Sequence, residues 1–209
     1  RKIRQPMGMQ HFTYGMPAAK LPELALNYAT GPRPGLLLGA FIKRALGADI
    51  VTVADTCNDP RFYQAIIPAG NLVASANEVS AFFQMMLNGG KWGRKRICEE
   101  STVVRAVQEF GSRSLDHTLL IPMRYSAGLM LGDEPFGIWG PHSRQAFGHV
   151  GLINKFAWAD PQRELSAAIL TSGIPVIAHH ILPLANLIRS IGNLTPRSQG
   201  LPPLALQFK

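Results

Sequence analysis

Three short apolar runs in the C-terminal half of the chain constrain its fold most. Each run has the length of one strand, and together they cover residues 145–151, 153–159 and 164–171. The second and third runs are separated only by Asp160-Pro161-Gln162-Arg163, which is typical of a hairpin connection. Because strands joined this tightly run antiparallel, we expect an antiparallel sheet built mainly from residues 119–172.

Helices are expected to flank this sheet. Ser75-Ala76-Asn77-Glu78 has the spacing of a capping box, in which serine and glutamate each satisfy an unpaired backbone N–H. Apolar residues then recur at intervals of three and four, and Asn88-Gly89-Gly90 ends the helix. Helical spacing also predicts a C-terminal helix over 176–192, with Pro183 in its first turns or at a kink. The inward-facing residues of the first helix are Val79, Phe82, Phe83 and Met86.

The pattern predicts an α+β fold in a single partial domain. Its parts are a mainly helical and loop region (1–118), antiparallel strands (119–172), a C-terminal helix (176–192) and an extended tail (195–209). Within these parts we expect a helix over 101–110 and one strand over 124–131. Residues 36–46 fit a strand or a helix, since periodicity cannot decide so short an apolar run.

The charge balance is basic, with 21 Lys and Arg against 13 Asp and Glu and a formal net charge of +8. Nucleic-acid binding needs such charges gathered on one surface. Only residues 1–4 and 91–96 form basic clusters, and the second follows a glycine turn, so no nucleic-acid partner is expected. The richest apolar stretch, 165–178, is interrupted by polar residues and proline, so we expect no membrane span.

Most generic catalytic motifs are absent from the sequence. It contains no Gly-x-Ser-x-Gly, no His-Glu-x-x-His and no Gly-x-Gly-x-x-Gly. The histidines lack metal-site spacing, and the adjacent His179 and His180 fit a structural or surface role better than metal ligation. Two cysteines cannot build a disulfide scaffold or a four-cysteine zinc site. We therefore expect neither a metal nor a cofactor.

One segment, Phe147-Gly148-His149-Val150-Gly151-Leu152, remains as a candidate site. In one interpretation, His149 is a buried or edge histidine whose flanking glycines permit a tight turn. In the other, the backbone passes close to a ligand, because glycines remove side chains there. A backbone N–H then points at an oxyanion, and the histidine supplies a proton or a hydrogen bond.

Three segments resemble the C-terminal half of the serine β-lactamase-like hydrolases. This family includes class C β-lactamases, low-molecular-weight penicillin-binding proteins and β-lactamase-like carboxylesterases. Gln5-Pro6-Met7-Gly8-Met9 is similar to the family's "PLGM" turn, and residues 67–90 are similar to its Pro-Ala-Gly-Gly stretch with the capped helix that follows. Residues 147–173 are similar to the strand of the third active-site motif and the hairpin after it. The resemblance spans about residues 3–192.

The resemblance implies an antiparallel sheet with helices on both faces and a site beside a helical lobe. In the family, a serine attacks a carbonyl, and a lysine and a tyrosine activate it. One oxyanion donor is the serine's own N–H, and the other comes from the third-motif strand. Here His149-Val150-Gly151 matches the third motif, so the resemblance implies a catalytic role for His149. It places Val150, Gly151 and the N–H of Leu152 on the substrate and oxyanion side.

The first two motifs of the family are missing. No serine in the 209 residues is followed by a lysine three places on, and no tyrosine by Asn or Ser two places on. In the family both motifs precede the "PLGM" turn, and this chain starts with Arg1 just before that turn. We therefore expect an incomplete chain that lacks the N-terminal part of the fold and is inactive alone. Self-association, or pairing with that missing part, is the expected consequence.

The full-length parent is expected to be a serine hydrolase, and the leading hypothesis is a carboxylesterase. Its substrate is a small-molecule ester or amide. The alternatives are a penicillin-recognising β-lactamase or peptidase, and a non-catalytic binding module of this fold. Val150 and His149 favour uncharged esters, because β-lactam-recognising relatives usually carry a hydroxyl residue and a lysine at these positions to hold a carboxylate.

Overall fold

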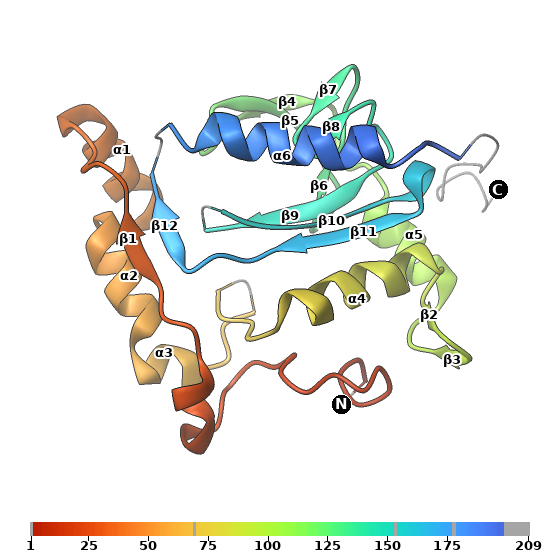
Figure 1. Cartoon of the computed structure of the whole chain (residues 1–209), viewed down its shortest axis with the longest axis horizontal. Coiled ribbons are helices and arrows are strands. Elements are labelled where there is room, and N and C mark those ends of the chain that lie inside the picture. Colours follow the sequence, from red (N-terminus) through yellow and green to blue (C-terminus); the bar gives the residue numbers. More distant parts are fainter. Residues whose placement is uncertain (1, 69, 153, 177–178, 199–209) are drawn as a thin grey trace.

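The central element is a six-stranded antiparallel sheet with helices on both faces. The computed structural model describes residues 2–68, 70–152, 154–176 and 179–198. The strand order in the sheet is β11-β10-β9-β6-β5-β4. Figure 1 shows the sheet between α6 on one face and α4 on the other. The predicted α+β fold with an antiparallel sheet is confirmed.

The elements follow one another closely along the chain. The helices are α1 (Leu36–Leu46), α2 (Ile50–Asn58), α3 (Pro60–Gln64), α4 (Ala76–Leu87), α5 (Glu100–Val107) and α6 (Ile181–Leu194), with 3-10 turns η1 (Ala18–Glu23) and η2 (Pro161–Arg163). The strands are β1 (Tyr28–Thr30), β2 (Lys91–Trp92), β3 (Lys95–Arg96), β4 (Ser114–Asp116), β5 (Ile121–Tyr125), β6 (Met130–Leu131), β7 (Phe136–Gly137), β8 (Gly140–Pro141), β9 (Phe147–Gly151), β10 (Lys155–Asp160), β11 (Leu165–Ile169) and β12 (Gly173–Pro175).

The β10–β11 connection is a tight turn held by an ion pair. The Asp160 carboxylate accepts a hydrogen bond from the backbone N–H of Gln162 at 3.0 Å, and Nη1 of Arg163 lies 2.6 Å from the same carboxylate. Both side chains of the pair are buried. The strands on either side of the turn are antiparallel, with Asp160 opposite Leu165, so the hairpin prediction is confirmed.

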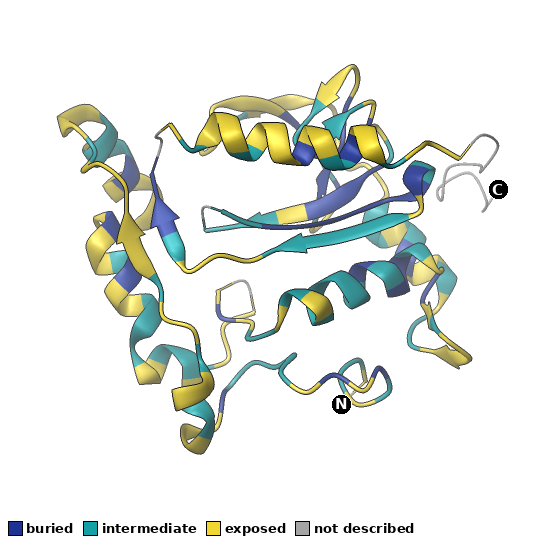
Figure 2. Cartoon of the chain, viewed as in Figure 1, coloured by how far each residue is buried: buried dark blue, intermediate teal, exposed yellow. Residues whose placement is uncertain are grey.

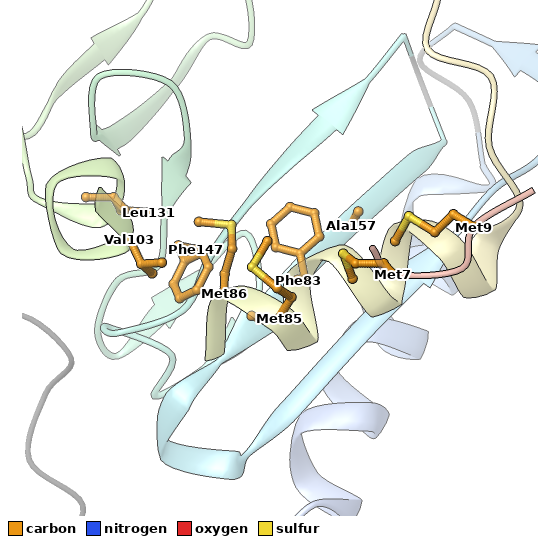
Figure 3. Packing of buried hydrophobic residues seen from close by; sticks show 10 residues of the cluster. Met7, Met9, Phe83, Met85, Met86, Val103, Leu131, Phe147 and Ala157 are labelled. Atoms are coloured by element: carbon orange, nitrogen blue, oxygen red, sulfur yellow. The ribbon is translucent and has the colours of Figure 1, made fainter. Parts of the chain in front are cut away.

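Helix α4 begins where the capping-box spacing predicts. The backbone N–H of Glu78 donates to Oγ of Ser75 at 3.2 Å, and the Glu78 carboxylate accepts from the backbone N–H of Ser75 at 2.9 Å. Figure 3 shows the side chains that α4 directs at the sheet, together with Phe147. Phe83 and Met86 are buried as predicted, and Met85, which the spacing did not select, is buried as well.

The two faces of the sheet carry separate cores, because side chains alternate along each strand. On the α4 face, Phe147, Ala157 and Ala159 pack with α4 and with Met7 and Met9 of the N-terminal turn. On the α6 face, the cluster is Met123, Met130, Trp139, Ala146, Phe156, Trp158 and Ile188.

Helix α6 is shorter at its N-terminus than the predicted 176–192. It starts at Ile181 and ends at Leu194, two residues later than predicted. Ahead of it, Gly173–Pro175 form strand β12, which pairs in parallel with β1, and residues 179 and 180 form a turn. Pro183 is its third residue and lies in the first turn, where a missing backbone N–H costs no helical hydrogen bond. Most of the predicted extended tail, residues 199–209, lies outside the described residues.

The single strand predicted over 124–131 is wrong. Two strands, β5 and β6, form an antiparallel hairpin there. Oγ of Ser126 accepts from the backbone N–H of Leu129 at 3.0 Å, and this local bond turns the chain within the predicted strand. The helix predicted over 101–110 is α5, which ends three residues earlier, at Val107.

Residues 28–64 form a small lobe at one end of the sheet (Figure 1). The ambiguous run 36–46 is helical and ends at Gly47, whose φ of 81° suits glycine at a helix end. Ile42 of α1 packs with Ile50 and Ala54 of α2, and Ile174 of β12 completes this cluster. The parallel β1–β12 pair joins the lobe to the segment that follows β11, the last strand of the main sheet.

Candidate active site

The candidate segment, residues 147–152, forms the whole of β9 and the first residue after it. On one side, β9 pairs with β10 over its whole length. On the other side, β6 reaches only Phe147 and Gly148. Among the described residues no strand pairs with this second edge of His149, Val150 and Gly151. Its backbone polar groups therefore lie along a strand edge that can accept a ligand or another segment.

His149 is exposed and is oriented by its own strand. Its Nδ1 lies 2.8 Å from the carbonyl oxygen of Val150, which can only accept a hydrogen bond. Nδ1 therefore carries the proton in the neutral ring, and Nε2 keeps its lone pair. An imidazole held in this tautomer can act as a base or accept a hydrogen bond through Nε2.

Val150 faces the opposite side of the sheet from His149. Its side chain packs against the cluster beneath α6, and its partner on β10 is Phe156 of that cluster. His149 instead lies opposite Ala157, which belongs to the core on the α4 face. The two neighbouring motif residues thus have different surroundings, and the Val150 side chain contributes to the core.

The two glycines of the motif make room for the neighbouring strand. A Cβ on Gly148 would lie 2.2 Å from the Ala157 carbonyl oxygen and 2.6 Å from Cβ of Trp158. A Cβ on Gly151 would lie 3.3 Å from Cβ of Lys155, its partner on β10. Sheet packing therefore requires glycine at position 148, whereas position 151 has nearly enough room for a Cβ.

Leu152 joins the end of β9 to the helical lobe. Its half-buried side chain packs against the cluster that contains Ile50 and Ala54 of α2 and Ile174 of β12. The next residue, 153, lies outside the described residues. The backbone of Leu152 is thus held at the junction between the sheet and the lobe.

Lys155 is a residue that the sequence-based search missed. Its Nζ is buried and has no hydrogen-bond partner among the described residues. Burial lowers the pKa of Lys155, and the charge of Cys57 opposes this shift. The period-two pattern could have revealed it, because Lys155 shares the face of Ala157 and Ala159.

Cys57 on α2 responds to the same surroundings. Burial raises the pKa of its thiol, and the charge of Lys155 opposes the rise. Both cysteines of the chain are free, and Cys57 is half-buried. Burial therefore shifts both the amine and the thiol toward their neutral forms.

A cavity of about 300 Å³ lies between the connection from β9 to β10 and strand β12. Asn154, Thr30 and Thr171 supply polar groups to its wall, and His179 and His180 complete it. In the described ranges, His, Cys, Asp and Glu nowhere gather in threes as a metal ion requires. None of the helices described there is long and apolar enough to cross a membrane.

The sequence of this chain matches the family model described as "Beta-lactamase" over residues 1–180. A curated relative is "Esterase/beta-lactamase LipL" from Mycobacterium tuberculosis, which is 29% identical over 106 residues. That match covers 51% of this chain and 23% of the relative.

Solved structures share the fold at low sequence identity. A penicillin-binding protein homologue from Caulobacter crescentus has a TM-score of 0.69 and 21% identity, over 91% of this chain and 50% of that one. A family VIII carboxylesterase has a TM-score of 0.70 and 22% identity, over 90% and 50% of the two chains. EstA from Arthrobacter nitroguajacolicus Rue61a has a TM-score of 0.66 and 20% identity, over 93% and 53%.

The chain thus spans about half the length of the solved structures that it matches and less than a quarter of the curated relative. The structural likeness concerns the fold, whereas the family model covers most of the sequence. The sheet, its flanking helices and the open edge of β9 agree with that match. This chain belongs to the beta-lactamase family.

Proposed function

We propose that this chain is the C-terminal part of a serine hydrolase of the beta-lactamase fold, and that the whole protein is a carboxylesterase. Its substrates are small uncharged esters, cleaved through an acyl-serine intermediate. The nucleophilic serine and its activating lysine and tyrosine belong to a segment upstream of Arg1. One relative named as an esterase/beta-lactamase and one solved structure named as a carboxylesterase support an ester as the substrate.

The open edge of β9 is the observation that carries this proposal. It leaves the backbone beside His149 and Gly151 free to meet a substrate. The N–H of Leu152 follows the motif glycine and is the proposed second oxyanion donor, with the first on the upstream serine. The packing of Leu152 against the lobe supports this role, because an oxyanion donor acts best when it is held in place before the reaction.

The preference for uncharged esters depends on His149. A neutral imidazole attracts a substrate carboxylate less than a lysine in the same place. Val150 contributes no argument about the substrate, because its side chain packs toward the core beneath α6. We therefore expect Val150→Thr to leave the ratio of ester to β-lactam hydrolysis unchanged, and His149→Lys to shift it toward β-lactams.

A fluorophosphonate probe tests the proposal directly. The longer protein is expected to take up one probe per chain, and the 209-residue chain alone none. Measuring kcat/KM for a short uncharged ester and for a cephalosporin then separates the substrate classes. Absence of labelling in the longer protein would favour a binding module, and efficient cephalosporin hydrolysis would favour the penicillin-recognising alternative.

A further inference from the structure

Helix α1 exposes an unusual combination of side chains on its outer face. Leu36 and Leu37 are 90% and 86% exposed, although both are fully apolar. Ala40, Lys43 and Arg44 continue the same face at helical spacing, and all three are exposed. We call Leu36, Leu37, Ala40, Lys43 and Arg44 the α1 stripe. The opposite face is anchored, since Leu38 and Ile42 pack toward α2.

The chain segment that contains the α1 stripe carries only positive charge. Residues 24–48 contain no Asp or Glu, while Arg33, Lys43 and Arg44 are basic. None of these three cations forms an ion pair with a carboxylate of the described residues. Asp49, the next acid along the chain, accepts hydrogen bonds from the backbone N–H groups of Val51 and Thr52, so it caps α2.

We propose that the α1 stripe docks this protein onto an anionic lipid surface. Leu36 and Leu37 enter the boundary between headgroups and acyl chains, and Lys43, Arg44 and Arg33 face the phosphates. Apolar side chains beside basic ones on one helical face are what such a surface binds. A second copy of the stripe offers Lys43 and Arg44 no carboxylate, because residues 24–48 contain no Asp or Glu.

The position of α1 is compatible with this docking. Figure 1 places α1 at the outer edge of the lobe, and Figure 2 shows its outward side as exposed. The lobe also contacts Leu152 at the end of β9. The proposal is independent of the proposed hydrolase function.

Co-sedimentation with vesicles tests the α1 stripe. The 209-residue chain is expected to bind phosphatidylcholine vesicles that contain phosphatidylglycerol, and to bind pure phosphatidylcholine weakly. The variant Leu36→Ser/Leu37→Ser should lower the partition coefficient about tenfold or more. Lys43→Gln/Arg44→Gln should lower it about fivefold per removed charge, and added salt should mimic that loss.

The control is Phe110→Ser/Phe136→Ser, whose rings are 78% and 75% exposed and lie within two residues of Glu109 and Glu134 in the chain. This control should bind vesicles as the unchanged chain does. Absence of binding to the anionic vesicles, or an equal loss in this control, would overturn the proposal. All variants should keep the unchanged circular dichroism spectrum, so that a folding defect is recognised.

The longer protein supplies a second measurement. Leu37→Cys, in a background with Cys57→Ser and Cys98→Ser, is labelled with an environment-sensitive fluorophore. Its emission should shift to the blue on anionic vesicles. A cysteine that resists labelling would show that polypeptide covers the stripe, and it would refute lipid docking. Hydrolysis of a soluble ester by Leu36→Ser/Leu37→Ser should stay unchanged, which separates this result from a failure of the proposed hydrolase function.

Discussion

At the scale of single residues, Lys155 is the least satisfied group among those described. A buried amine without an acceptor destabilises the folded chain, because its hydration is lost without replacement. Its place opposite Gly151 joins this cost to the candidate site. A buried, unpaired lysine is expected where its amine takes part in the reaction, or where a further segment of the protein supplies a hydrogen-bond acceptor for it.

We expect Lys155→Met to stabilise the 209-residue chain by about 1–3 kcal/mol at neutral pH, since methionine keeps the apolar stem and removes the unpaired donor. The folded-state pKa of Lys155 is lowered, so the unfolded chain binds its proton more readily. The free energy of unfolding of the unchanged chain should therefore rise as the pH increases from that lowered pKa toward 10.5. Over the same pH range, its difference in stability from Lys155→Met should disappear.

Urea unfolding at neutral and alkaline pH measures this difference. The exposed Lys91 supplies the control, and Lys91→Met should leave the free energy of unfolding nearly unchanged. A loss of stability in Lys155→Met would mean that the amine has a partner in solution, contrary to its surroundings in the structure.

Gly148 and Gly151 should respond differently to the same added methyl group. Gly148→Ala is expected to lower the free energy of unfolding by about 1–3 kcal/mol, because the new Cβ meets backbone atoms of β10 that cannot move aside. Gly151→Ala should change it by less than about 1 kcal/mol, since its new Cβ comes no closer than 3.3 Å to any neighbour, and a shift of a few tenths of an ångström relieves that contact. Thermal unfolding of both variants gives the comparison, and equal losses would contradict it.

Sequence patterns located the candidate segment but not the roles of its side chains. The glycines around His149 suggested close approach to a ligand, whereas Gly148 serves the packing of Trp158. The orientation of Val150 depends on the register with β10, which no local pattern in β9 specifies. The open edge depends on where β6 ends, and β6 is a two-residue strand that the sequence did not separate from β5.

At the scale of elements, Glu78 connects α4 to the N-terminal turn. Its carboxylate caps Ser75 and also accepts from the backbone N–H groups of Gln10 and His11, at 2.6 and 2.7 Å. Burial opposes ionisation, but the hydrogen bonds from Ser75, His11 and Gln10 lower the pKa of Glu78 overall. One side chain thus satisfies donors from two distant parts of the chain.

We expect Glu78→Gln to cost about 1 kcal/mol at neutral pH, because the amide oxygen is a weaker acceptor for these N–H groups. The stabilisation by Glu78 is present above the unfolded pKa near 4.5 and is lost as the pH falls through its lowered folded value. The difference between the two chains should therefore vanish in acid. Glu99→Gln is the control, since Glu99 makes no side-chain cap at α5.

Elements with local signals were predictable, and those with distant partners were not. The capping box placed α4 correctly, and the Asp160-Pro161 turn predicted the β10–β11 hairpin. Strand β12 was not predicted, because its three residues fall between the predicted strand over 164–171 and the predicted helix over 176–192, and only its partner β1 defines it as a strand. That partner lies near the other end of the chain, beyond the range of any local pattern.

At the scale of the whole molecule, Arg163 ties three separate parts together. Besides its ion pair with Asp160, it donates to the carbonyl oxygens of Gly192 in α6 and of Pro141 in β8, at 2.9 and 3.0 Å. It also donates to His142 at 3.2 Å. The β10–β11 turn, β8 and the C-terminal end of α6 therefore depend on one buried guanidinium.

We expect Arg163→Met to lower the free energy of unfolding by about 3–5 kcal/mol, since it leaves a buried carboxylate and several carbonyls unpaired. The double variant Asp160→Leu/Arg163→Met should recover part of that loss by removing the unpaired charge. Arg197→Met, at an exposed position, should have little effect. Denaturant unfolding of these three variants decides the matter, and a single variant as stable as the double one would contradict the coupling.

The main sheet ends in β11, whose outer edge pairs with no strand among the described residues. Such an edge favours pairing between molecules. We expect the 209-residue chain to self-associate as its concentration rises, and Leu170→Lys beside β11 to reduce this, because a charge near a strand edge opposes pairing. Light scattering that shows a strict monomer at high concentration would contradict this expectation.

The stacked pair Trp139 and Trp158 gives the molecule an internal optical reporter. Both indoles are buried, their ring centroids are 5.7 Å apart, and their planes differ by only 16°. Transition dipoles held this close couple, and the skew between the two dipoles within their stacked planes gives the pair a far-ultraviolet circular dichroism signal that neither ring gives alone. Since the pair lies in the core beneath α6, this signal follows the docking of that helix separately from the helical content of the chain.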